Sequence, residues 1–405
     1  MQPFIKTIFV VVLLLFCIIA FSNSYSFSNI DNLAFATAIG IDVSETNNIK
    51  VTFQFVKQSP NNESSNNDNK VVTDTVEAPS ITSAINIMNA YLDKKVDLSH
   101  CKIIIFSEEI AQNDITNYIY SLMNDIQVRP TANIIITKCT ANDYIKYSEP
   151  SLETSVTKYY ETFPKSSKYT GYIADNTIGD FFNSLLCSSC EPLAILGDIK
   201  SSDSSDNLNL NKNNSNIIAG NSSITSTRRT ENLGLAAFNY GKFVGELNVT
   251  DSICYHILQN DINSFLISVP NPEKENEFID VYITQKSNPK IVVKIVNGSP
   301  YIKINCKLNA KISSISENSK YLNKDVLNSI SNSCTNYLST NLTNYLYKTS
   351  LDFKSDINGI GTHALSIFLT NKDFDNYNWT ANYVNSTFDV IIKTNLESSY
   401  FLTQT

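Results

Sequence analysis

The sequence has few glycines, prolines and charged residues for its length. Its 405 residues include 11 glycines, 11 prolines and 17% charged side chains, whereas average composition is about 7% glycine, 5% proline and 25% charged. This composition excludes a collagen-like chain and a coiled coil. Asparagine and serine supply the polarity instead, with 51 and 48 residues. We attribute that bias to an AT-rich coding sequence and draw no function from it.

Positive charge, histidine and long apolar runs are also scarce. The net charge is -8 and the isoelectric point is about 5.1, which disfavours nucleic-acid binding because nucleic-acid readers carry basic patches. The three histidines, His100, His256 and His363, are far apart, so each is expected to be structural. We expect no metal site and no cofactor. A single long apolar run excludes a membrane protein with several spans.

The eight cysteines are too few and too scattered to form a disulfide scaffold in a chain of this length. Most are expected to be free and buried, because they lie in apolar segments. Cys187 and Cys190 form a lone Cys-x-x-Cys. A structural disulfide or two ordinary thiols is the favoured interpretation, because zinc needs a second pair and a thioredoxin-like motif precedes its helix rather than follows it.

The amino-terminal segment predicts export. Residues 8–21 form an unbroken apolar run after Lys6, which suits a signal peptide or an uncleaved membrane anchor within residues 1–24. Cys17 is a candidate lipidation site, but Phe16 stands before it where such sites need a small residue. Cleavage near Ser22 or Ser24, or retention as an anchor, is therefore favoured over lipidation.

The remaining chain is predicted to be multi-domain. Residues 25–200 alternate short apolar strands with amphipathic helices, which indicates an α/β layer with both sheet faces covered. This part has room for two subdomains. Residues 201–232 are rich in Ser, Asn and Asp, lack apolar periodicity and are predicted to be a linker or long loop. Residues 233–405 form the second domain.

The second domain is predicted to be an antiparallel sheet covered by a long helix. Residues 301–312 alternate apolar and polar side chains, and Asn297-Gly298 before them is a strong turn signal. Residues 319–349 carry apolar side chains at helical spacing and provide the cover. The fold class is therefore α+β overall, with mixed α/β character in the first part.

No catalytic constellation is present in the sequence. It contains no dinucleotide-binding or phosphate-binding glycine loop and no Gly-x-Ser-x-Gly elbow. We therefore predict that the protein is not an enzyme. An exported hydrolase or a thiol oxidoreductase using Cys187 and Cys190 is retained as a minor alternative.

The order of short motifs is similar to that of one known family. The motifs of the first half lie at residues 38–42, 51–55, 99–109 and 125–129. Those of the second half are the hairpin at 234–245, Ile315-Ser-Glu317, Asp356-Ile-Asn-Gly-Ile-Gly361 and a late Trp379. On these motifs the chain resembles the Ger(x)C family, the C subunits of Ger-type spore germinant receptors of endospore-forming bacteria. The lipid-attachment motif typical of that family is replaced by Ser24-Tyr25-Ser26.

The resemblance implies a non-enzymatic subunit tethered to the outer face of the spore inner membrane. Its partners would be the integral membrane A- and B-type receptor subunits, and its role would be to support nutrient-triggered germination. The resemblance does not imply that this subunit contacts the germinant. Glu317, Asp356, Gly359 and Gly361 are the candidate structural or interaction residues, with helix capping and turn formation as the simpler roles for them.

An extracytoplasmic solute-binding protein is the main alternative. Two α/β-containing halves joined by a linker permit a ligand cleft between them. Such proteins usually have two similar lobes, however, and the two halves of this sequence differ.

Overall fold

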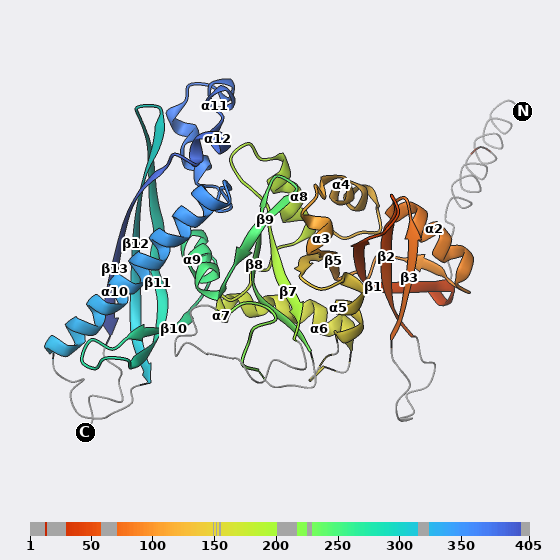
Figure 1. The fold of residues 1–405 in the computed structure, drawn as a ribbon, viewed down its shortest axis with the longest axis horizontal. Helices are drawn as coiled ribbons and strands as arrows, with labels where there is room; N and C mark the ends of the chain where they lie inside the picture. The colour runs from red at the N-terminus through yellow and green to blue at the C-terminus, as the bar shows by residue number, and fades with distance from the viewer. Residues whose placement is uncertain are drawn as a thin grey trace, which may run out of the picture.

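Two β-sheets, each covered by helices, lie side by side along the long axis of the molecule (Figure 1). The computed structural model describes residues 13, 30–57, 71–148, 150, 152, 153, 155–200, 217–224, 229–314 and 324–397. The predicted signal or anchor segment, most of the predicted linker and Glu317 lie outside these residues. The expected mixed α+β class is confirmed.

The first sheet has nine strands and is built around a parallel centre. Its order is β3-β2-β1-β5-β6-β7-β8-β9, and β4 also pairs with β1. Strands β1, β5, β6 and β7 are parallel, and antiparallel hairpin strands extend the sheet on both sides. The bounds are β1 Leu33–Val43, β2 Ile49–Val56, β3 Val71–Ala78, β4 Lys95–Asp97, β5 Ile103–Ser107, β6 Asn133–Thr137, β7 Leu193–Ile199, β8 Thr230–Asn239 and β9 Lys242–Leu247.

Both faces of the central strands of this sheet are buried, as the continuous apolar runs predict. In β5, Ile104 and Phe106 pack into one core, whereas Ile103 and Ile105 pack into the other, because successive strand residues point to opposite faces. The first core is covered by α2 Ile81–Tyr91, α3 Glu108–Ala111, α4 Thr116–Asn124 and α8 Ile178–Leu186. The second is covered by α5 Ala141–Tyr147 and α6 Val156–Thr162, followed by η2 Phe163–Ser166 and α7 Ser167–Thr170.

The second sheet has the order β10-β11-β12-β13. Its strands are β10 Phe265–Pro270, β11 Phe278–Val296, β12 Ser299–Ser314 and β13 Thr387–Glu397. Asn297 and Gly298, both at positive φ, form the predicted turn between β11 and β12. The long helix α10, Lys324–Tyr347, crosses one face of the strands (Figure 1) and packs into their core.

One strand pair differs from the antiparallel arrangement expected from the sequence. β13 runs parallel to β12, with Tyr301 opposite Thr387. The chain leaves the end of β12, returns along α10, and then passes through several short helices before it enters β13. Because this crossover brings the chain back to the starting end of β12, the next strand must run in the same direction. The short elements are η4 Lys348–Asp352, η5 Ile360–His363, η6 Leu365–Ile367, α11 Asn371–Tyr377 and α12 Trp379–Tyr383.

The connection between the sheets follows the β8–β9 hairpin. This hairpin comes after the Ser- and Asn-rich stretch in sequence, but β8 pairs with β7 and so completes the first sheet. Helix α9, Val249–Gln259, then starts at a capping box formed by Asn248 and Asp251 and packs into the core of the second sheet. The division of the chain into domains at residues 201–232 stays a prediction.

Candidate functional site

Asp356 is the centre of a buried polar cluster where the segment after α10 meets the first sheet. Its side chain is 1% exposed. One carboxylate oxygen accepts the backbone N–H of Ile360 at 2.9 Å. The other accepts the backbone N–H of Gly361 at 2.7 Å and the indole N–H of Trp379 at 2.8 Å. One carboxylate thus fixes the start of η5 and the only tryptophan of the sequence.

The surrounding segment is held on the first sheet by further contacts. The Ser355 hydroxyl donates to the carbonyl of Phe238 in β8 at 2.5 Å, and the Asn239 amide donates to the carbonyl of Lys354 at 2.8 Å. The ring of Phe353 lies over Gly245 of β9, where an added Cβ would come within 2.2 Å of it. Residues 353–361 therefore bridge the two sheets.

Glu191 is a second buried carboxyl group in the same place. It lies two residues before β7, and its side chain accepts the backbone N–H of Tyr240 at 2.6 Å. Its own backbone N–H donates to the carbonyl of Asp356 at 3.2 Å. The sequence analysis missed Glu191. Its position between a cysteine and Pro192, just before an apolar strand, was the available signal that it would be buried.

Burial raises the pKa of both carboxyl groups. The pKa of Glu191 rises to about 7, chiefly because the charged form loses its hydration, and the neighbouring Asp356 charge adds to the effect. Burial likewise raises the pKa of Asp356 to about 6, although the N–H groups of Gly361, Ile360 and Trp379 oppose that rise. The cluster is therefore sensitive to protons in the range from weakly acidic to neutral pH.

The two glycines that the sequence analysis singled out, Gly359 and Gly361, are required for different physical reasons. Gly359 has φ 63°, in the left-handed region, which glycine enters without the steric cost that a side chain brings. Gly361 is needed for space, because an added Cβ would lie 2.5 Å from Trp379 Nε1 and 2.8 Å from the Cβ of Ser189. Cys190, on the same segment as Ser189, lies beside Gly359.

Cys187 and Cys190 form a disulfide just before Glu191. The other described cysteines are free thiols, and all but the half-buried Cys139 are buried. Burial raises the pKa of Cys101, Cys306 and Cys334 to about 12, so these thiols stay protonated. The expectation that most cysteines are inert core residues is confirmed for the described part of the chain.

A pocket of about 390 Å³ opens beside the Asp356 cluster, between the two sheets. Cys190, Glu191 and Leu193 line one side, and Tyr255 and Gln259 of α9 with Asn358, Gly359 and Thr362 line the other. The pocket offers amide, hydroxyl and carboxyl groups. Within the described residues, no group of three or more His, Cys, Asp and Glu side chains could hold a metal ion.

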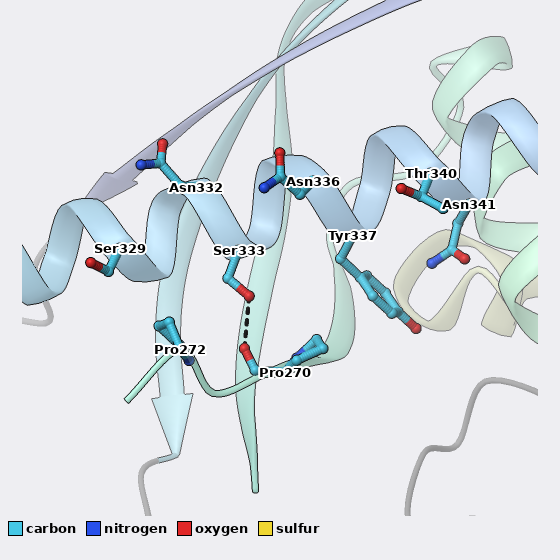
Figure 2. A pocket seen from close by; sticks show the side chains of 9 residues that line it. All are labelled: Pro270, Pro272, Ser329, Asn332, Ser333, Asn336, Tyr337, Thr340 and Asn341. Atoms are coloured by element: carbon cyan, nitrogen blue, oxygen red, sulfur yellow. Dashed lines mark hydrogen bonds between the residues drawn. The ribbon is translucent and has the colours of Figure 1, made fainter. Parts of the chain in front are cut away.

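A larger pocket, of about 540 Å³, follows α10 on the side of β10 (Figure 2). One wall consists of Pro270 and Pro272, and Figure 2 shows the Ser333 hydroxyl bonded to the carbonyl of Pro270, at 2.7 Å. The other wall is a row of uncharged polar side chains on α10 together with Tyr337. The side chains that line this pocket can form hydrogen bonds, but none of them is a carboxylate, histidine, lysine or cysteine that could serve as a general acid, a general base or a thiol nucleophile.

The remaining predicted residues do not join the Asp356 cluster. Cys17 and Glu317 lie outside the described residues. His256 is buried and satisfied, with Nδ1 2.6 Å from Asp261 and Nε2 2.8 Å from the carbonyl of Ile173, as expected for a structural histidine. No helix in the described part of the chain is both long and apolar enough to span a membrane.

Two family profiles match the chain in order. The profile described as "Spore germination protein N-terminal domain" matches residues 26–196, and the one described as "Spore germination B3/ GerAC like, C-terminal" matches residues 233–400. The chain belongs to the Ger(x)C family of spore germination proteins. In this Ger(x)C protein the buried cluster joins the two matched regions, because Glu191 lies in the first and Asp356 in the second.

A curated relative and a solved structure agree with this membership. The Ger(x)C chain is 21% identical over 318 residues to spore germination protein KC of Bacillus subtilis (strain 168), a match that spans 75% of this chain and 74% of that protein. Its fold is similar to the crystal structure of the GerBC protein, with a TM-score of 0.51 and 15% identity over 89% of this chain and 98% of that one.

Proposed function

We propose that this Ger(x)C protein is a non-enzymatic, membrane-tethered subunit of a spore germinant receptor. It assembles with integral membrane A- and B-type subunits on the outer face of the spore inner membrane and supports nutrient-triggered germination. The observation that carries the proposal is the ordered match of both family profiles, which together reach from residue 26 to residue 400. The apolar residues 8–21 support the tether.

The buried cluster supports a structural rather than a catalytic role for the junction. Both oxygens of Asp356 accept N–H groups of the protein itself, and Glu191 accepts another. A general acid or base must reach a substrate proton, whereas these carboxyl groups are used to hold one segment on another. The proposed activity is therefore one of assembly.

Deletion of the gene tests the proposal. We expect spores without this chain to lose nutrient-triggered germination, to keep germination by nutrient-independent treatment, and to recover when the wild-type chain is restored. A tagged chain purified from spore membranes should bring two integral membrane subunits with it. Normal nutrient germination in a strain without any related gene would contradict the proposal.

A solute-binding role is the second candidate, and the polar pocket between the sheets is the observation in its favour. The two sheets differ in strand number and order, which distinguishes this chain from proteins with two similar lobes. Calorimetric titration of the chain with amino acids and sugars separates the candidates, because stoichiometric binding heat would support the second one.

A further inference from the structure

One stretch of the sequence carries positive charge alone. Residues 281–316 contain six lysines and no aspartate or glutamate, in a chain whose net charge is -8. Strands β11 and β12 and the turn between them contain all six of these lysines. The remainder of the protein is correspondingly more acidic, so this hairpin is electrostatically distinct from its surroundings.

The strand alternation places five of these six lysines, all but Lys286, on the sheet face opposite α10. In β12, Ile302, Ile304, Cys306 and Leu308 are buried in the core that contains the apolar side chains of α10. Side chains between them must point to the other face. Six lysines lie on that side of the sheet, and we call this surface the lysine face: Lys290, Lys294, Lys303, Lys307, Lys311 and Lys393.

The lysine face is broad and exposed. Its lysines come from three neighbouring strands, β11, β12 and β13. Lys303, the one with an ion-pair partner described here, has a side chain that is still 43% exposed, and the other five are exposed as well. Lys303, Lys307 and Lys311 follow one another at intervals of about 13 Å, given about 3.3 Å per strand residue. The charges are thus spread along the strands and across three neighbouring strands.

The charges on this face are only partly balanced within the protein, because β13 places Asp389 opposite Lys303 and Glu397 opposite Lys311 but no acidic residue opposite Lys307. Asp389 lies 3.0 Å from Lys303 and accepts a hydrogen bond from Tyr301 at 3.1 Å. Lys307 and Lys393, in contrast, are directly opposite each other on adjacent strands. Like charges in that position destabilise a sheet, and a bound anionic surface would relieve their repulsion.

We propose that the lysine face docks on an anionic membrane surface, where its ammonium groups contact lipid phosphates. Charges spread over one broad sheet face fit a bilayer surface better than they fit a nucleic-acid groove or an extended acidic peptide. The lysine ammonium group is a compact charge that can donate to phosphate oxygens from many directions, whereas the rigid fork of arginine suits a partner held in one orientation. Basic clusters of this kind are attracted to anionic lipid surfaces. The proposal does not depend on the receptor function proposed above.

Lysine reactivity on vesicles tests the docking directly. The full chain is reconstituted with phosphatidylcholine vesicles that contain either no phosphatidylglycerol or about 30 mol % of it. A water-soluble reagent then acylates the lysines, and mass spectrometry measures the rate at each lysine. We expect the lysine face to react on the order of threefold more slowly on the anionic vesicles. Four exposed lysines elsewhere, Lys95, Lys146, Lys242 and Lys372, should react equally on both. Salt at about 0.5 M should abolish the difference through screening.

A charge-removal variant provides the matched test. In the variant Lys290→Gln, Lys294→Gln, Lys307→Gln and Lys311→Gln, the remaining Lys303 and Lys393 should lose their protection on anionic vesicles. The control Lys95→Gln, Lys146→Gln, Lys242→Gln and Lys372→Gln should keep the protection of the lysine face. Equal protection of both lysine sets on wild-type chain would overturn the proposal. Protection by a soluble acidic polypeptide or polyphosphate but not by vesicles would overturn it too.

Discussion

Glu191 shows how burial changes the chemistry of one carboxyl group. Its side chain keeps a single backbone N–H from Tyr240, while burial raises its pKa to about 7. The folded state therefore binds this proton more tightly than the unfolded state does. Its stabilising contribution is complete below the ordinary carboxyl pKa and is lost as the pH rises through about 7.

Glu191→Gln tests this dependence. Glutamine keeps an acceptor for Tyr240 and cannot ionise, so we expect the variant to match the wild type near pH 4 and to be more stable by about 3 kcal/mol near pH 8. Urea unfolding of the full chain across this pH range measures the difference. The exposed Glu109→Gln is the control and should show no such trend. A wild-type stability that rises from pH 5 to pH 8, with Glu191→Gln following it, would contradict the argument.

The segment formed by residues 353–361 is the element that decides how the second half meets the first. It enters η5 through Gly359 at positive φ and passes under Trp379 at Gly361. The sequence motif Asp356-Ile-Asn-Gly-Ile-Gly361 predicts a turn there, which the structure contains. The motif does not reveal that the indole of Trp379 shares the Asp356 carboxylate, because that contact needs α12 to fold back over the segment.

Gly361→Ala tests the close packing of this element. The added methyl group would meet Trp379 and Ser189, so we expect a loss of about 2–3 kcal/mol by overpacking and a shift in the fluorescence of the single tryptophan. Gly298→Ala is the matched control, because its Cβ would have nothing within 4 Å and only the positive φ is strained. That control should cost about 1 kcal/mol and leave the fluorescence unchanged. Equal effects of the two substitutions would show that Trp379 does not constrain Gly361.

At the scale of the whole molecule, the Asp356 cluster adds a polar link between two sheets that already share one apolar core, in which Leu193, Leu235 and Leu247 of the first sheet pack with the second sheet. Trp379 belongs to this shared core, and the segments that contain Glu191 and Phe238 belong to the first sheet. We therefore expect one cooperative unfolding transition, with the tryptophan fluorescence and the far-ultraviolet circular dichroism changing at the same urea concentration.

In the Asp356→Ala chain, we expect the tryptophan fluorescence and the circular dichroism to change at different urea concentrations. The substitution leaves two backbone N–H groups and the indole N–H without their acceptor, which costs on the order of 3 kcal/mol or more, and the fluorescence transition should then come first. Asp352→Ala removes a nearby exposed carboxylate and should leave the two probes coincident. Coincident transitions in the Asp356→Ala chain would show that the coupling lies elsewhere.

The local patterns of the sequence predicted much of this fold for a physical reason. The alternation in residues 301–312, the apolar spacing in α10 and the Asn297-Gly298 turn each depend on neighbours within a few residues, and each is present in the structure. Family membership was likewise predictable, because the order of short motifs can be recognised in the sequence without knowing which residues are in contact.

Other features depended on segments that meet only in three dimensions. The direction of β13 followed from the crossover through α10, the β8–β9 hairpin completed the sheet before it, and Glu191 became buried beside a segment about 165 residues later in the chain. The sequence alone shows that lysine is the only charged residue type in residues 281–316. Only the pairing of β11, β12 and β13, with α10 on the opposite side, gathered five of those lysines and Lys393 onto one face.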